Sequence, residues 1–158
     1  MNNKNQALDL AVQPHMDTSL FGVLLTSGLS ILGLDLGIVS KVYGSNYELV
    51  EILTVPDKPV GFVSGDILQI KSTYCRDVVS SGKALALTEL DGIRGLRRHP
   101  LYTSMILEAY IAAPIFFAER GWGTINFSSP SFRAKPFSIS EIALINSYAG
   151  IISDSLSG

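Results

Sequence analysis

The chain has 158 residues, of which 47% are apolar and only 16% are charged, and its formal net charge is −2. This composition is typical of a single globular domain with a sizeable core, and it argues against a disordered chain. The charge balance gives no support for a nucleic-acid partner or an anionic membrane surface, and we expect neither.

The chain contains one cysteine, Cys75, and two histidines, a poor starting set for a zinc site or an internal disulfide. Residues 1–16 have no long apolar core and are interrupted by Pro14, so we interpret them as a leader or linker and not as a secretory signal. No run approaches the roughly 20 apolar residues of a membrane span. We therefore expect a cytoplasmic protein with one domain over residues 17–157.

The first half of the domain predicts a helix followed by a β-hairpin. Asp17 is a candidate N-cap for a helix over residues 18–32. Two strand-like runs follow, "LDLGIVSKVYG" and "SNYELVEILTV", and the turn between them is expected at Gly44-Ser45-Asn46. From Ser64 to Ser81 the pattern is mixed, with a short helix expected in "STYCRDVVSSG". A short strand in "ALALTEL" and a loop over residues 91–105 follow.

The last third predicts a second hairpin and a second long helix. The hairpin runs from Leu107 to Pro130, and its turn is expected at Glu119-Arg120-Gly121. Ser138 and Glu141 form a capping box for a final helix that reaches about Leu156. Strands linked by tight turns pair antiparallel, and two apolar helices need one sheet face to cover. The sequence therefore predicts an α+β fold of three layers. Its centre is an antiparallel sheet of five or six strands, with the terminal helices on one face and the loop-rich middle third on the other.

Several motifs resemble a known family. "GDILQIKSTYCRDVVSSGKALALTE", "HPLY", "LEAYIAAPIFF" and "GWGTINFSSPSFRAKPFSISEIALINSYAGIIS" are similar to the GAF domains found beside bacterial histidine kinases and diguanylate cyclases. The resemblance covers about residues 20–156. It implies a non-catalytic regulatory module that senses a small molecule and signals to an output kinase or cyclase domain. It does not specify the ligand, because GAF domains bind cyclic nucleotides, bilins, haem or amino acids.

The resemblance also gives a role to alternating polar residues in the second hairpin. In GAF domains one face of the central strands meets the terminal helices and the other forms the floor of the pocket. Ile125 and Phe127 suit the helix side, so Thr124, Asn126 and Ser128 would line the pocket. Buried polar groups without partners cost about 1–3 kcal/mol each, so partners are expected. Two interpretations stay open: a ligand, or satisfaction by the loop layer or by solvent at an exposed strand end.

Other candidate pocket residues lie in the middle third. His99, restrained by the proline after it, and three amphipathic tyrosines are able to contact a planar ligand. A purely structural role for each is the alternative interpretation. The candidate ligand-binding set is Tyr74, His99, Tyr102, Tyr110, Thr124, Asn126 and Ser128.

Two activities known among GAF domains are not expected. Photoreceptors of this family attach a bilin through a cysteine placed just before the loop histidine, and here that position is Arg98. Methionine-sulfoxide-reducing members need at least two cysteines, and this chain has one. No P-loop, nucleophile elbow or zinc-protease motif is present. We expect no enzyme activity, no metal and no covalent bilin.

The terminal helices carry more apolar surface than one sheet contact needs, which predicts a homodimer. The candidate interface residues are Leu20, Leu24, Ile31, Ile145 and Ile152. The alternative to a sensor is a structural dimerisation or scaffold domain with a filled pocket and no ligand.

Overall fold

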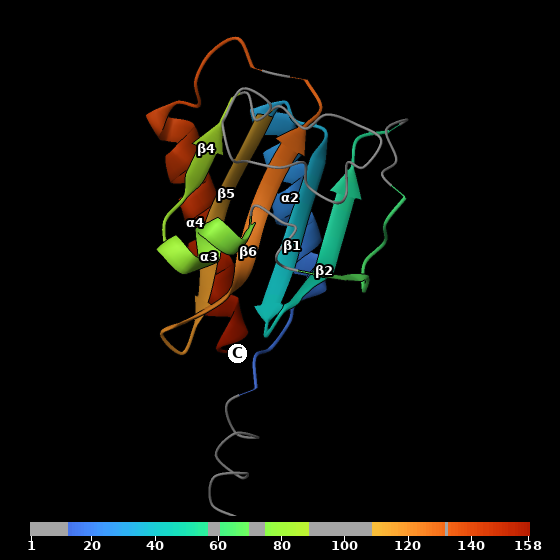
Figure 1. The fold of residues 1–158 in the computed structure, drawn as a ribbon, viewed down its shortest axis with the longest axis vertical. Coiled ribbons are helices and arrows are strands. Elements are labelled where there is room, and N and C mark those ends of the chain that lie inside the picture. The colour runs from blue at the N-terminus through green and yellow to red at the C-terminus, as the bar shows by residue number, and fades with distance from the viewer. Residues whose placement is uncertain (1–12, 57–60, 70–74, 89–108, 132) are drawn as a thin grey trace, which may run out of the picture.

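Figure 1 shows the fold of the computed structural model, which describes residues 13–56, 61–69, 75–88, 109–131 and 133–158. In chain order the elements are α2 (Thr18–Leu32), β1 (Leu36–Tyr43), β2 (Asn46–Thr54), β3 (Ile67–Gln69), α3 (Cys75–Ser81), β4 (Leu85–Leu87), β5 (Ala109–Phe117), β6 (Arg120–Ser129) and α4 (Ile139–Leu156). Both terminal helices and both hairpins agree with the prediction. The three-residue strand β3 was missed, because so short a run carries no readable periodicity.

The six described strands form one antiparallel sheet in the order β3-β2-β1-β6-β5-β4. Each half of the sheet is built from three consecutive strands. The two halves join at the centre, where β1 pairs with β6 and Ile38 lies opposite Asn126. The predicted α+β class with a central antiparallel sheet is confirmed.

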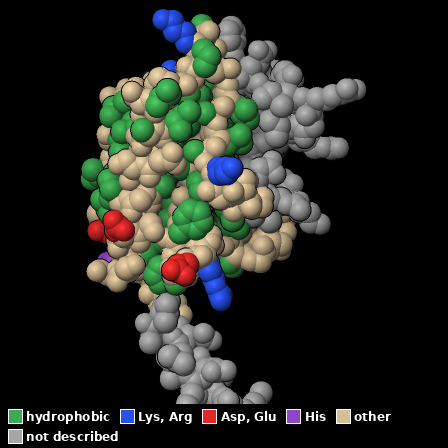
Figure 2. All heavy atoms as spheres, turned by 90° about the vertical axis from the view of Figure 1, so that its left-hand side faces the viewer, with side chains coloured by type: hydrophobic (Ala, Val, Ile, Leu, Met, Phe, Trp, Pro, Cys, Tyr) green, Lys and Arg blue, Asp and Glu red, His purple; other side chains and the backbone are tan. Residues whose placement is uncertain are grey.

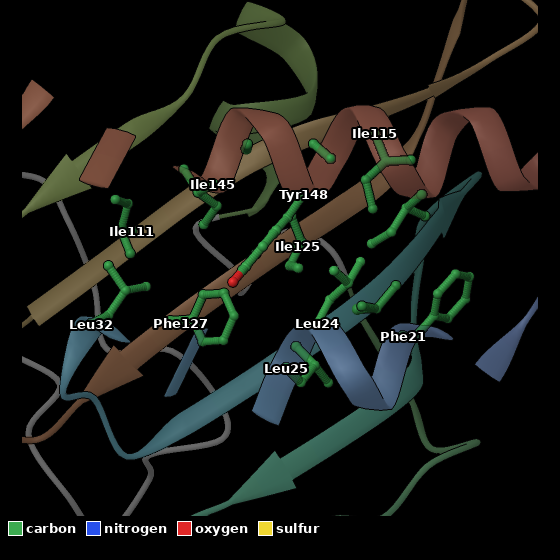
Figure 3. Close-up of a cluster of buried hydrophobic side chains, with 14 of the residues drawn as sticks. Phe21, Leu24, Leu25, Leu32, Ile111, Ile115, Ile125, Phe127, Ile145 and Tyr148 are labelled. Atoms are coloured by element: carbon green, nitrogen blue, oxygen red, sulfur yellow. The ribbon is translucent and has the colours of Figure 1, made fainter. Parts of the chain in front are cut away.

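The terminal helices α2 and α4 cover one face of this sheet, and α3 lies on the other (Figure 1). One apolar cluster joins both terminal helices to the sheet (Figure 3) and includes Phe21, Leu25, Ile125, Phe127, Ile145 and Tyr148. Val78 of α3 belongs to a second cluster on the opposite face. The predicted placement of Ile125 and Phe127 beneath the helices is therefore confirmed.

Local capping signals fix the ends of both terminal helices. The Asp17 carboxylate accepts a hydrogen bond from the Leu20 amide at 3.1 Å and so caps α2. In the capping box of α4, Ser138 Oγ accepts from the Glu141 amide at 3.1 Å, and the Glu141 carboxylate accepts from the Ser138 amide at 2.9 Å. Each cap pairs backbone N–H groups that a helix start leaves without partners.

The predicted turn of the second hairpin is displaced. Phe117 pairs with Arg120, so the turn consists of Ala118 and Glu119, both with positive φ. This two-residue turn matches the twist of the flanking strands. The predicted turn glycine, Gly121, instead lies in β6, where a Cβ would come within 3.1 Å of Val79 Cγ1 in α3. In the first hairpin, Asn46 likewise belongs to β2 and not to the turn.

A β-bulge next to this turn redirects the only tryptophan of the chain. Ile115 lies opposite Gly123 and Phe116 lies opposite Gly121, so Trp122 is an extra residue in β6. A bulge lets a side chain leave the regular alternation of a strand. Trp122 packs in the helix-side cluster, and its ring centroid lies 6.5 Å from that of Phe21.

Candidate functional site

The candidate pocket residues divide into those that the structure describes and those that it does not. Tyr74, His99 and Tyr102 lie outside the described residues, as does Arg98. Tyr110 lies on β5 and the other three on β6. The site is therefore built from the sheet face opposite α2 and α4.

Thr124, Asn126 and Ser128 form a fully buried polar row along β6. Their side chains are 0%, 2% and 2% exposed. These values rule out the interpretation that this end of the strand faces solvent. Burial also means that each polar atom needs a hydrogen-bond partner, because an unpaired one would cost about 1–3 kcal/mol.

A chain of side-chain hydrogen bonds runs through the row and extends into β1 and β2. Ser40 Oγ and Thr124 Oγ1 share a hydrogen bond of 2.8 Å. Asn126 Nδ2 donates to Thr124 Oγ1 and to Tyr47 OH, each at 3.3 Å. Three strands therefore contribute to one polar network. From here on, Ser40, Tyr47, Thr124, Asn126 and Ser128 are called the polar row.

Ser40 and Tyr47 were not predicted as site residues. Ser40 faces Thr124 because β1 and β6 pair in a register that brings together residues 84 positions apart. Tyr47 reaches Asn126 from β2, with β1 lying between the two strands. The only sequence signal for Ser40 is its spacing along β1. It follows Leu36 and Ile38 at every second position, so its side chain lies on the same face of the sheet as theirs.

Tyr110 lies beside the row on β5. It is directly opposite Ser128 in the antiparallel register and is 1% exposed. Around the row lie apolar side chains of the second cluster: Leu36, Ile38, Leu49, Val78 and Ala112. The described part of this face thus combines an apolar surface with hydroxyl and carboxamide groups, the usual lining of a small-molecule site.

No acidic or basic side chain belongs to either the polar row or the second apolar cluster as the structure describes them. Across the described residues, no three His, Cys, Asp or Glu side chains gather to hold a metal ion. Hydroxyl and carboxamide groups recognise a ligand by donating and accepting hydrogen bonds. The described part of this face is therefore equipped for recognition through hydrogen bonds.

The predicted dimer residues need a correction. Leu24, Ile145 and Ile152 pack inside the core of the chain itself, between the helices and the sheet, so they are not surface residues. Leu20 is half-buried, and only Ile31, at 58% exposure, is fully on the surface. The exposed apolar side chains of the helix layer are Val23, Ile31, Ile139 and Ile151. The apolar residues that recur along each helix therefore mainly mark the side that packs on the sheet.

Two grooves lie along the helix layer, away from the polar row. One, of about 460 Å³, runs between α4 and the start of β4, where Lys83, Phe116, Asn146 and Ser153 line it. The other, of about 500 Å³, lies between α2 and β2. Figure 2 views the molecule from the β4 side, where hydrophobic side chains are spread over the described surface and few charged side chains are seen.

A family model described as "GAF domain" matches residues 18–156. The chain belongs to the GAF family. The match runs from the first residue of α2 to the last residue of α4. Comparison with curated protein sequences finds no match.

Solved structures of several proteins share the fold at low sequence identity. The cyanobacteriochrome receptor PixJ superposes with a TM-score of 0.70 at 16% identity, covering 88% of this chain and 93% of that chain. The GAF-B domain of DevS from Mycobacterium smegmatis gives 0.64 at 14% identity, covering 88% and 91%. The free methionine-R-sulfoxide reductase from Neisseria meningitidis gives 0.66 at 13% identity, covering 89% and 79%. At these identities the likeness extends to the GAF fold alone.

Of the helices that the structure describes, none combines the length and the apolarity needed to cross a membrane.

Proposed function

We propose that this GAF domain is a cytoplasmic sensor module that binds a small molecule on the sheet face carrying the polar row. The observation that supports the proposal is the buried network from Ser40 through Thr124 and Asn126 to Tyr47. A purely structural face does not need such a network, because replacing both partners of a buried neutral hydrogen bond by apolar groups of the same shape can be nearly neutral or stabilising. Recognition of a ligand gives the five polar side chains a role that stability does not require.

The ligand-binding residues of the proposal combine structure and sequence. Tyr110, Thr124, Asn126 and Ser128 come from the described sheet face, together with Ser40 and Tyr47. Tyr74, His99 and Tyr102 are added from the sequence alone. The hydroxyl and carboxamide chemistry of the described part suits a ligand that offers several hydrogen-bonding groups beside an apolar surface.

The proposal includes neither catalysis nor a covalent bilin. The sulfoxide reductases among the structural neighbours are enzymes, but the family chemistry needs a second cysteine, and Cys75 is the only one here. For the bilin, the sequence has Arg98 where the attaching cysteine of a photoreceptor would stand. A visible absorption band that stays with the chain after denaturation would contradict this part of the proposal.

We also propose that the domain acts as a homodimer within a signalling protein that has a kinase or cyclase output. Helix α2 contains no charged residue, and α4 contains only Glu141 and Asp154. The segment entering α2 touches the end of α4, because the His15 amide donates to the Leu156 carbonyl at 2.9 Å. A shift of the helix layer would therefore also displace the segments at which the chain enters and leaves the domain.

Native mass spectrometry of protein purified from its own host tests the sensor proposal. We expect wild-type protein to retain a small molecule that Thr124→Val and Asn126→Leu lose, because both remove hydrogen-bonding groups from the row. Thr26→Val is the matched control, since its hydroxyl bonds only the Gly22 carbonyl within the exposed part of α2, and it should retain the molecule. Wild-type protein with the mass of the bare chain would favour the scaffold alternative.

A further inference from the structure

Phe127 stands between two members of the polar row but faces the other way. Asn126 and Ser128 flank it in β6, and successive side chains of a strand point to opposite faces of the sheet. Asn126 therefore belongs to the buried polar network, while Phe127 packs in the cluster under the helices. Any displacement of β6 at Asn126 also moves the Phe127 ring.

The Phe127 ring rests directly on the backbone of α2. A Cβ placed on Gly28 would lie 2.1 Å from Phe127 Cζ, and one placed on Gly37 of β1 would lie 3.0 Å from Cε1. Only a hydrogen atom fits at Gly28, so the Phe127 ring contacts the backbone of α2 with no side chain between them. Interiors packed in this way transmit small movements instead of absorbing them.

The residue next to Gly28 links α2 to α4. Ser27 Oγ and Tyr148 OH share a hydrogen bond of 2.7 Å, and Tyr148 is itself buried. In Figure 3 the Tyr148 side chain points from α4 toward Phe127. Four residues therefore meet at one place, and we call Ser27, Gly28, Phe127 and Tyr148 the helix junction. A slide of α2 relative to α4 has to stretch or break the bond between the two hydroxyls.

We propose that the helix junction carries the state of the polar row to α4: a ligand that displaces β6 at Asn126 pushes Phe127 against Gly28 and changes the Ser27–Tyr148 hydrogen bond. This inference rests on the proposed function of the polar row and adds the route by which its occupancy reaches the helix layer. The two states differ in whether the buried Tyr148 hydroxyl keeps its partner on α2, and a ligand shifts their populations by its differential affinity. Tyr148 and Ser27 act in this scheme as positioning residues that touch no ligand.

Amide hydrogen exchange on the full chain tests the route without any ligand. Asn126→Leu mimics a change in the row, and we expect it to alter exchange in α2 around Gly28 and in α4 around Tyr148 by about twofold or more. In the Tyr148→Phe background, Asn126→Leu should still alter α2 but no longer α4. Ser153→Ala is the matched control, because it removes another hydrogen bond of α4, the one to the Phe116 carbonyl. In that background the response of α4 should persist.

Two outcomes overturn the inference: an Asn126→Leu response confined to the sheet, or an α4 response that survives Tyr148→Phe. If Asn126→Leu does not fold, Thr124→Val replaces it, since valine keeps the shape of threonine and removes the hydroxyl bonded to Asn126. The result is independent of the mass-spectrometry test. If the protein retains a ligand but Asn126→Leu does not change exchange in the helices, only the route through the helix junction is refuted. If Asn126→Leu changes exchange in the helices but the protein retains no ligand, only the sensor proposal is refuted.

Discussion

Ser40 Oγ and Thr124 Oγ1 lie 2.8 Å apart across the central strands β1 and β6, and both side chains are fully buried. The two residues are directly opposite each other in the antiparallel register. Thr124 also accepts from Asn126, so it is the link between β1 and the rest of the polar row. This pair lies on the sheet face opposite the two terminal helices.

Thr124→Val is expected to lower the free energy of unfolding by about 1–3 kcal/mol, because it deprives the buried Ser40 hydroxyl of its closest partner. Urea denaturation measures the change. The double variant Ser40→Ala/Thr124→Val should lose less than the sum of the single losses, since it removes both halves of the pair. Thr26→Val, on the exposed part of α2, should stay within about 0.5 kcal/mol of wild type. Equal stability of Thr124→Val and wild type would contradict the role given to the pair.

Gly28→Ala should destabilise the protein by about 1–3 kcal/mol or more, because the added methyl would overlap the Phe127 ring. Gly22→Ala is the matched control in the same helix, since a Cβ there meets nothing within 4 Å. It should raise stability by about 0.5–1 kcal/mol through helix propensity alone. Thermal or urea unfolding of the two variants therefore isolates the contact with Phe127. If both variants change the free energy of unfolding in the same direction, the Phe127 ring does not pack directly against α2.

Most of the fold was predictable because its signals are local. Asp17 caps α2, the capping box of Ser138 starts α4, and the alternation of Thr124 with Ile125 assigned the faces of β6 once the GAF resemblance was known. Each signal lies within a few residues of the feature that it predicts.

The errors in the predicted site have a different physical origin. Ser40 joins the polar row through strand register, which no local pattern of β1 specifies. Leu24, Ile145 and Ile152 were assigned to a dimer because an apolar helix stripe looks the same whether it contacts a sheet or a second subunit. Trp122 breaks the alternation of β6 at a bulge whose position depends on the partner strand.

The stability contributed by Glu141 should depend on pH. Burial acts to raise the pKa of its carboxyl, but the Ser138 amide and the Arg133 guanidinium, bonded at 2.9 Å and 3.0–3.2 Å, outweigh burial and lower it. A carboxyl whose pKa is lowered in the folded state stabilises the fold at pH values above its unfolded pKa, near 4.5. This stabilisation disappears as the pH falls through the pKa of the folded state.

Glu141→Gln tests this dependence, since glutamine at this position still closes a capping box but carries no charge. We expect the variant to unfold at lower denaturant concentration than wild type at pH 7, and the difference to shrink below about pH 4 as Glu141 is protonated. Urea midpoints measured between pH 7 and pH 3 give the comparison. A difference that is the same at every pH would show that the charge is not what stabilises the start of α4.

The exposed apolar residues of α2 and α4 lead to a prediction about the oligomeric state. Val23 and Ile151 are 65% and 41% exposed on α2 and α4, whereas Leu24, Ile145 and Ile152, first expected at the interface, are buried in the core. Multi-angle light scattering should give wild-type protein twice the mass of the chain, and Val23→Lys/Ile151→Lys should give the monomer mass. A lysine in a desolvated apolar interface costs several times the gain from the side chain that it replaces. Ile67→Lys is the matched control, because Ile67 is similarly exposed at 53% but lies on the edge strand β3, away from both helices. A wild-type monomer would contradict the homodimer, and a dimer that survives the double substitution would place its interface elsewhere than on the outer faces of α2 and α4.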